Sequence, residues 1–248
     1  MKDHLDGLYL QLSEAKSAWT TFTRETKQIN KLQLQIDGAL QPQDRIARIH
    51  IRGVDIPLKR HLKVLGVTLD SQLRFHKHVD TISKKVRKNT NVIKALATSK
   101  AGQCKDSLVS TYKAIGRSLI DYAAPVLSPN ASQASIDKLQ FAQNAALRAA
   151  TGCHMMSDPD HLHAETSLLK VKAHCKLLSG QFLANCYNPN HPCHELAIGQ
   201  DERDFPRRVH TSLGMAYRAW VKGRMVFDPG GVATNWLEAR KQLHSEVV

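Results

Sequence analysis

The chain has 248 residues, of which 42% are hydrophobic and 23% charged, so it can fold around a core as one domain or two small ones. Its 35 Lys and Arg exceed its 22 Asp and Glu by 13, which favours a polyanionic partner, because neutralised phosphates release counterions. The charge alone equally fits a generic basic protein.

Two further features concern the compartment. The 5 cysteines show no CxxC spacing, which argues against a disulfide framework. The first residues, MKDHLDGLYL, carry charge where a signal peptide needs an apolar stretch, and no run approaches the roughly 18 apolar residues of a membrane span. We therefore expect a soluble, intracellular protein of the nucleus or cytoplasm, with no membrane partner.

Alternating hydrophobicity predicts strands in the first part of the chain. Residues 31–37 (KLQLQID) and 47–53 (ARIHIRG) both alternate with period two, and the polar QPQD at 41–44 suits a turn between them. Residues 63–70 (KVLGVTLD) predict a further strand. Gly66 inside it indicates a bulge or a close approach of another backbone.

A helical period begins at His76 and continues for about six turns. The apolar side is formed by Val79, Ile82, Val86, Ile93 and Ala97. Lysines and one arginine lie largely on the opposite side, and Asp80 is the only carboxylate in the stretch. A solvated helix surface explains such a side equally well. The shortage of acidic neighbours favours phosphate as the partner.

Four more helices are predicted further along the chain. The first spans 106–120, the second starts with Ser132 as N-cap and stops at Gly152, the third covers 171–187, and a short one occupies 233–244. The expected core positions of the first three are Leu108, Tyr112, Ile115 and Leu119, then Ile136, Leu139, Leu147 and Ala150, then Leu178 and Phe182.

Several stretches, in this order, resemble the C-terminal part of the reverse transcriptases of non-LTR (LINE-type, Jockey-like) retrotransposons. LQLSEAKSAWTTFT (10–23) resembles motif D, which follows the catalytic palm motifs, and KVLGVTLDSQLRFHKHV (63–79) resembles the primer grip, motif E. TYKAIGRSLIDYAAPVLSPN (111–130) and LQFAQNAALRAATG (139–152) resemble thumb helices. HLHAETSLLKVKAHCKLLSGQF (161–182) is similar to the segment after the thumb.

The resemblance implies an α+β fold, in which a small β-hairpin remnant of the palm precedes a mainly α-helical thumb and post-thumb module. The implied organisation is a palm remnant at 1–60, a primer-grip-like hairpin at 61–75, a helical thumb at 76–152, a helical post-thumb segment at 153–200 and a loosely ordered tail with a short helix at 201–248.

The resemblance also implies roles for individual residues. Lys16 matches the motif D lysine, a possible general acid toward the leaving pyrophosphate, although a solvated lysine is an equal alternative. Leu65, Gly66 and Val67 match the primer grip, for which a plain buried hairpin is the alternative. The cations that would contact the phosphates of an RNA template and a DNA primer are Lys84, Lys85, Arg87, Lys88 and Lys94.

The departures from the family concern catalysis. Reverse transcriptases hold two metal ions with paired aspartates, and no Asp-Asp pair occurs in this sequence. We therefore expect a partial RNA-directed DNA polymerase that grips template–primer, is inactive alone and binds no cofactor itself, although full-length family members need Mg. Its further partner would be the missing N-terminal polymerase part. The alternative is a stand-alone, non-enzymatic helical nucleic-acid-binding protein derived from such an element.

One cluster has metal-ligand chemistry, namely Cys186, His191, Cys193 and His194. The spacing is irregular for zinc, which prefers CxxC or HxxxH pairs, so no metal site is predicted and a zinc-stabilised interaction module remains a third hypothesis. The aromatic residues expected in the core, rather than as stacking platforms, are Trp19, Phe75, Tyr112 and Tyr122.

Overall fold

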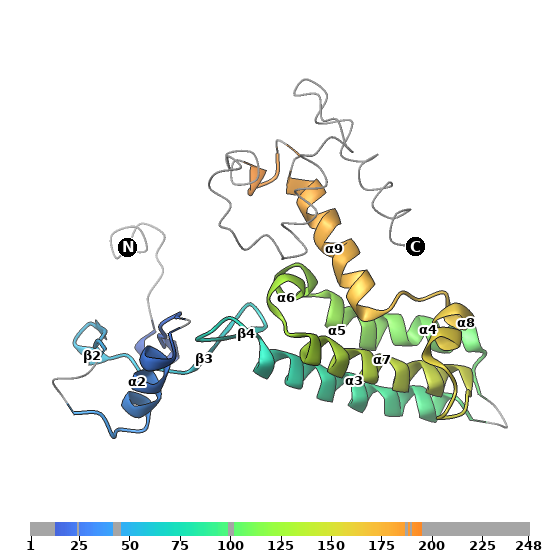
Figure 1. Ribbon diagram of the computed structural model, residues 1–248, viewed down its shortest axis with the longest axis horizontal. Coiled ribbons are helices and arrows are strands. Elements are labelled where there is room, and N and C mark those ends of the chain that lie inside the picture. The colour runs from blue at the N-terminus through green and yellow to red at the C-terminus, as the bar shows by residue number, and fades with distance from the viewer. Residues whose placement is uncertain are drawn as a thin grey trace. The chain divides into compact units, whose positions relative to one another are not determined.

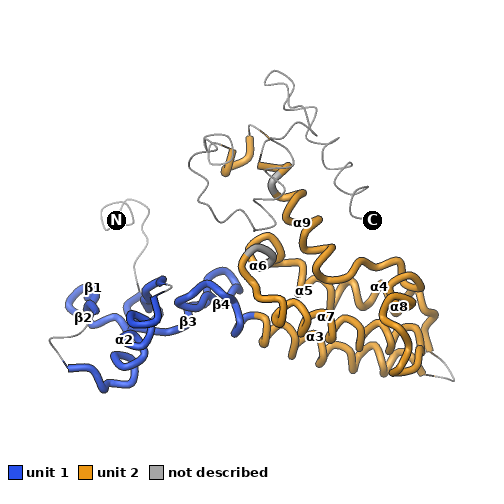
Figure 2. The backbone as a smooth tube through the Cα atoms, in the orientation of Figure 1, with its two compact units in different colours: residues 1–78 blue, residues 79–248 orange. Residues whose placement is uncertain are grey.

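The computed structural model describes residues 13–23, 25–41, 46–98, 102–186, 188 and 190–194. It divides into two units, residues 1–78 (blue in Figure 2) and residues 79–248 (orange). The described part is mostly helical, with two small antiparallel hairpins near the N-terminus, which confirms the predicted α+β class. The expected short helix at 233–244 lies outside the described residues.

Unit 1 contains one helix and two hairpins. Its elements are η1 (Glu14–Lys16), α2 (Thr26–Ile36), β1 (His50–Ile51), β2 (Val54–Asp55), β3 (His61–Val64) and β4 (Val67–Asp70). The strand predicted at 31–37 is wrong, because this stretch belongs to α2. Its Lys, Gln and Leu are strong helix formers, and Ile29, Leu32 and Ile36 also fit helical spacing, with Leu32 buried.

Each hairpin has a two-residue turn in which the second residue is glycine. Arg52–Gly53 joins β1 to β2, Leu65–Gly66 joins β3 to β4, and all four residues have positive φ. Positive φ at both central positions is the geometry that fits the twist of a two-residue hairpin. The stretch 63–70 is therefore two paired strands rather than one strand with a bulge, and its glycine lies in the turn.

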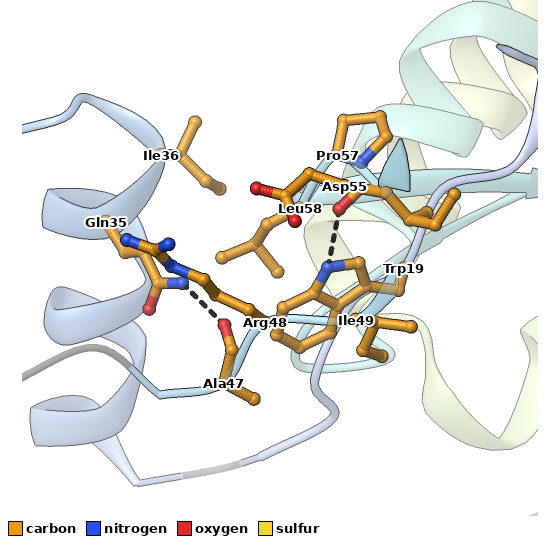
Figure 3. Close-up of a pocket in the computed structure, with 10 residues that line it drawn as sticks. Trp19, Gln35, Ile36, Ala47, Arg48, Ile49, Asp55, Pro57 and Leu58 are labelled. Carbon is orange, nitrogen blue, oxygen red and sulfur yellow. Dashed lines mark hydrogen bonds between the residues drawn. The ribbon is translucent and has the colours of Figure 1, made fainter. Parts of the chain in front are cut away.

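Trp19 connects the N-terminal segment of unit 1 to the residues that follow β2. The indole Nε1 donates a hydrogen bond of 3.0 Å to the Ile56 carbonyl, and the Trp19 backbone bonds to Pro57 and Lys59. A cleft of about 320 Å³ opens beside this indole, between Gln35 of α2 and the β1–β2 hairpin (Figure 3). Gln35 donates to the Ala47 carbonyl across it at 3.1 Å. Trp19 itself is half-buried, whereas Phe75 is buried as predicted.

Unit 2 is a helical bundle (Figure 1). Its helices are α3 (His76–Leu96, which begins in unit 1), α4 (Lys105–Tyr112), η3 (Lys113–Arg117), α5 (Ser118–Asp121), α6 (Ala124–Asn130), α7 (Gln133–Thr151), α8 (Pro159–Thr166) and α9 (Val171–Cys186). The start of α3 and the extent of α7 match the predictions. Ser132 caps α7, since its hydroxyl accepts from the Ser135 N–H, and Gly152 ends it with φ 72°.

A π-helical turn, η3, interrupts the helix predicted at 106–120. Tyr112 before the turn is buried as expected, but Ile115 and Leu119 are only half-buried, and Arg117 and Ile120 are buried instead. A π turn contains an extra residue, so the positions after it rotate by about 100° relative to a continuous α-helix. The core prediction therefore fails after the turn.

A buried polar network fixes the segment between α8 and α9. Arg117, only 4% exposed, donates from Nε to Asp121 at 3.2 Å and from Nη1 to the Leu169 carbonyl at 3.1 Å. Its Nη1 also bonds to Gln143 of α7, which itself donates to the Leu169 carbonyl at 3.0 Å. His174 of α9 lies 3.2 Å from the second Asp121 oxygen. Four helical elements thus share one set of partners.

Further core predictions in unit 2 are wrong, beginning with Ala97, which was expected on the apolar side of the helix that begins at His76 and is exposed. Leu178 is half-buried and Phe182 is 38% exposed, because the buried side of α9 runs through Val171, Cys175 and Leu177. Tyr122, expected in the core, is 67% exposed in the turn after α5.

Candidate nucleic-acid interface

The predicted phosphate-binding cations lie together on one side of α3. All five side chains, Lys84, Lys85, Arg87, Lys88 and Lys94, are exposed. The residues facing the bundle, Val79, Ile82, Val86 and Ile93, are buried as predicted. We call the side of α3 that carries these five cations the basic face.

The basic face has little acidic compensation. Among the residues that the structure describes, no carboxylate forms an ion pair with any of the five cations. At 1.5 Å per residue, Lys84 and Lys94 are about 15 Å apart along the helix axis. The face therefore presents concentrated positive charge, the electrostatic footprint of a protein that binds a polyanion.

Side-chain contacts hold α3 against other helices of unit 2. Asn89 donates to the Ile115 carbonyl in the π turn at 2.6 Å. Lys138 of α7 pairs with Asp80 of α3 at 2.8 Å. The orientation of the basic face is thus set by the bundle core and by two polar contacts.

The predicted primer-grip residues lie at the turn of the β3–β4 hairpin in unit 1. Leu65 is 86% exposed and has φ 47°, an uncommon conformation for a bulky side chain, and Gly66 has φ 86°. Val67 begins β4 and is half-buried. The turn therefore presents backbone and one apolar side chain to solvent.

Lys16 lies in η1 and is exposed. Its neighbour Glu14 pairs with Arg52 at 3.5 Å, so one carboxylate of this turn is engaged by the β1–β2 hairpin. None of the predicted site residues lines the cleft beside Trp19.

The candidate zinc ligands have other partners. His194 bonds through Nδ1 to the Cys186 carbonyl at 3.2 Å, and the His191 ring packs edge-on against Phe182. Burial, and then the neighbouring Cys193 thiol, raise the pKa of Cys186, which disfavours the thiolate that zinc binds. Within the described ranges, no three His, Cys, Asp or Glu side chains come together as a metal site requires.

Sequence reasoning missed one exposed aromatic residue beside the basic face. Phe141 of α7 is 66% exposed. A helical wheel of α7 already places it opposite Leu139, so the signal was present in the sequence.

A known protein is similar to part of this chain. It is described as a probable RNA-directed DNA polymerase from transposon X-element of Drosophila melanogaster, and it is 28% identical over 123 residues. The similarity is to a reverse transcriptase. The match covers 50% of this chain but only 13% of that protein, so the similarity is distant and partial.

No protein-family model and no solved structure matches the chain. The relation to a non-LTR reverse transcriptase thus has support from comparison, whereas the assignments of motif D, primer grip and thumb stay predictions. In the described part of the chain, no helix combines the length and the apolarity needed to cross a bilayer.

Proposed function

We propose that this chain is the template–primer-gripping part of a non-LTR retrotransposon reverse transcriptase, with unit 2 as its thumb. The observation that carries the proposal is the basic face, five exposed cations on one side of α3 with no carboxylate partner among the described residues. The partial similarity to a transposon polymerase supports the same function.

The chemistry of the basic face suits a nucleic-acid backbone. Double-stranded DNA carries one negative charge per about 1.7 Å of its axis, so a face about 15 Å long lies opposite several phosphates. Flexible lysine side chains contact phosphates without reading base edges. Binding should therefore be strongly dependent on salt and only weakly dependent on sequence.

The β3–β4 hairpin would hold the primer strand through its turn. Gly66 has no side chain and lets a strand approach the backbone closely, and Leu65 is held exposed in a conformation that costs energy. Lys16 would serve as the general acid of motif D only when the catalytic part of the polymerase lies beside it.

Polymerisation requires groups that this sequence does not contain. Two-metal phosphoryl transfer needs a carboxylate pair, and the chain has no Asp-Asp pair. We expect the purified chain to incorporate no deoxynucleotide on primed RNA with Mg²⁺ or Mn²⁺. Template-dependent incorporation by contaminant-free protein would overturn this expectation. The aspartates would come from the N-terminal polymerase part, the expected partner.

A second candidate is a stand-alone, non-enzymatic nucleic-acid-binding protein derived from such an element. It is favoured by the same missing aspartate pair together with unit 2, which has its own buried core. The genomic sequence upstream of the Met1 codon separates the two candidates. An in-frame polymerase aspartate motif supports the first, and a promoter directly before Met1 supports the second.

The test of binding is charge reversal on the basic face. The triple variant Lys84→Glu, Arg87→Glu and Lys88→Glu should lose most of its affinity for an RNA–DNA hybrid, measured by fluorescence anisotropy at several salt concentrations. With three to five phosphate contacts, the parent should show a slope of log K against log salt of roughly −2.7 to −4.5, since each contact contributes about 0.9 on B-form DNA.

The matched control reverses three exposed lysines elsewhere on unit 2, Lys113, Lys172 and Lys176, and so makes the same change in net charge. The control should retain most of the affinity if the basic face is the interface. Both variants should fold, because exposed substitutions usually change stability by about 0.5 kcal/mol or less. Equal loss in both variants would show that only the net charge of the chain matters.

A further inference from the structure

Phe141 stands out on the solvent side of α7. The core residues of this helix, such as Leu139 and Leu147, are fully buried on the opposite side, whereas Phe141 is 66% exposed. The exposed positions one turn away along the helix are Asp137, Lys138 and Ala145, of which Asp137 accepts a hydrogen bond from Gln133 at 2.8 Å and Lys138 pairs with Asp80. The face of the phenyl ring is therefore open to a ligand.

The position of Phe141 places it beside the basic face. Lys138, one turn before Phe141, pairs with Asp80 of α3 at 2.8 Å, so the two helices are adjacent at this level. In Figure 1 the chain runs in the same direction along α3 and along α7. Phe141 is therefore level with Lys84, which lies one turn beyond Asp80 on α3.

Helical geometry also puts the ring and the cations on the same side of the helix pair. Going around α3 at 100° per residue, Asp80 borders α7, Lys84, Lys88 and Lys85 follow on the solvent side, and Arg87 and Lys94 lie within about 40° of Asp80 on its α7 side. Going around α7, Lys138 borders α3, and Phe141 follows 60° further from α3. For two parallel helices these two directions point to the same surface. The basic face and Phe141 thus form one continuous surface.

We propose that Phe141 stacks on an unpaired base of a nucleic-acid strand whose phosphates lie on the basic face. This inference rests on the proposed function and adds a ligand class to it, namely a single-stranded segment next to a duplex. Proteins that bind single strands combine cations along the backbone with aromatic rings under the bases, because every base has a π-face that can stack. A base inside an intact duplex is already stacked and cannot reach the ring.

The experiment compares two labelled probes, an RNA–DNA hybrid with blunt ends and the same hybrid with a single-stranded RNA extension. Phe141→Ala should weaken binding of the extended probe by roughly 5- to 150-fold, the range measured for loss of one stacked base. Binding of the blunt probe should hardly change. Phe141→Tyr should restore the affinity, because it retains the ring, and Phe141→Leu should not.

Two controls separate stacking from other effects. Phe182→Ala removes a partly exposed aromatic side chain from α9, which carries none of the five cations, and should leave both affinities unchanged. Raising the salt should weaken parent and Phe141→Ala alike and leave their ratio constant, because stacking involves no counterion release.

The outcomes distinguish the two proposals. If the parent binds both probes, charge reversal on the basic face abolishes binding, and Phe141→Ala matches the parent on the extended probe, the stacking inference is wrong and the thumb proposal stands. Equal weakening on blunt and extended probes would also overturn it, since the ring then contributes without an unpaired base. If the parent binds neither probe, both proposals fail.

Discussion

Arg117→Ala should destabilise unit 2 strongly. The arginine is almost completely buried, and the substitution removes its bonds to Asp121, Gln143 and the Leu169 carbonyl. Removing one partner of a buried ion pair costs about 3–5 kcal/mol, because the remaining charge and acceptors lose their compensation. His174 stays 3.2 Å from Asp121 and compensates part of this loss, so we expect about 3 kcal/mol, the lower end of the range.

The assay is urea unfolding followed by circular dichroism at 222 nm, which reports mainly on the helices of unit 2. The matched control is Lys113→Ala, an exposed position in the same π turn, which should change stability by about 0.5 kcal/mol or less. The double variant Arg117→Met with Asp121→Leu should recover part of the loss, since it replaces both members of the ion pair by apolar side chains while Gln143 still donates to the Leu169 carbonyl. A loss below about 1 kcal/mol for Arg117→Ala would refute the assignment of this network as structural.

Three other substitutions test separate features. Leu65→Asn should stabilise the β3–β4 hairpin and so slow hydrogen exchange of its amides. Asparagine tolerates the left-handed conformation that costs leucine about 1 kcal/mol, and the exposed leucine side chain loses few packing contacts when it is replaced. Unchanged exchange would contradict the turn geometry. Gly116→Ala should destabilise unit 2 by about 1–3 kcal/mol in urea unfolding, because its Cβ would lie 2.6 Å from the buried Tyr112 ring; a neutral effect would mean that the ring can move. Burial lowers the pKa of His163 below its usual 6.5, so the unfolded chain binds the proton more readily than the folded chain. The stability of the parent should therefore fall as the pH drops through about 6.5, and His163→Gln should flatten this pH profile. A parent stability that does not change over this pH range would contradict the prediction.

The parts predicted correctly from sequence are those set by local signals. The start of α3 follows from apolar residues at helical spacing, and the limits of α7 follow from a serine cap and a glycine stop. The same spacing separated the basic face from the buried side of α3. These features depend on residues within a few turns of one another, so one sequence suffices.

The missed features depend on contacts between distant segments. The period-two pattern of 31–37 fits a strand, but helix propensity and the burial of Leu32 decide the outcome. The π turn at 113–117 is stabilised by Asn89 from α3 and by the partners of Arg117 on α7, none of which is near in sequence. Exposure of Phe141 was visible on a helical wheel, but its position beside the basic face required the pairing of α7 with α3.

The π turn also predicts which deletions related sequences can tolerate at this place. It contains one residue more than an α-helical turn, so deletion of one of the residues 113–116 would rotate the following positions, Arg117 included, by about 100°. Such a deletion would move Arg117 out of the core and leave Gln143 without its partner. A homologue with a one-residue gap at this place should therefore have lost the arginine and the glutamine together, whereas a homologue without the gap should have kept both.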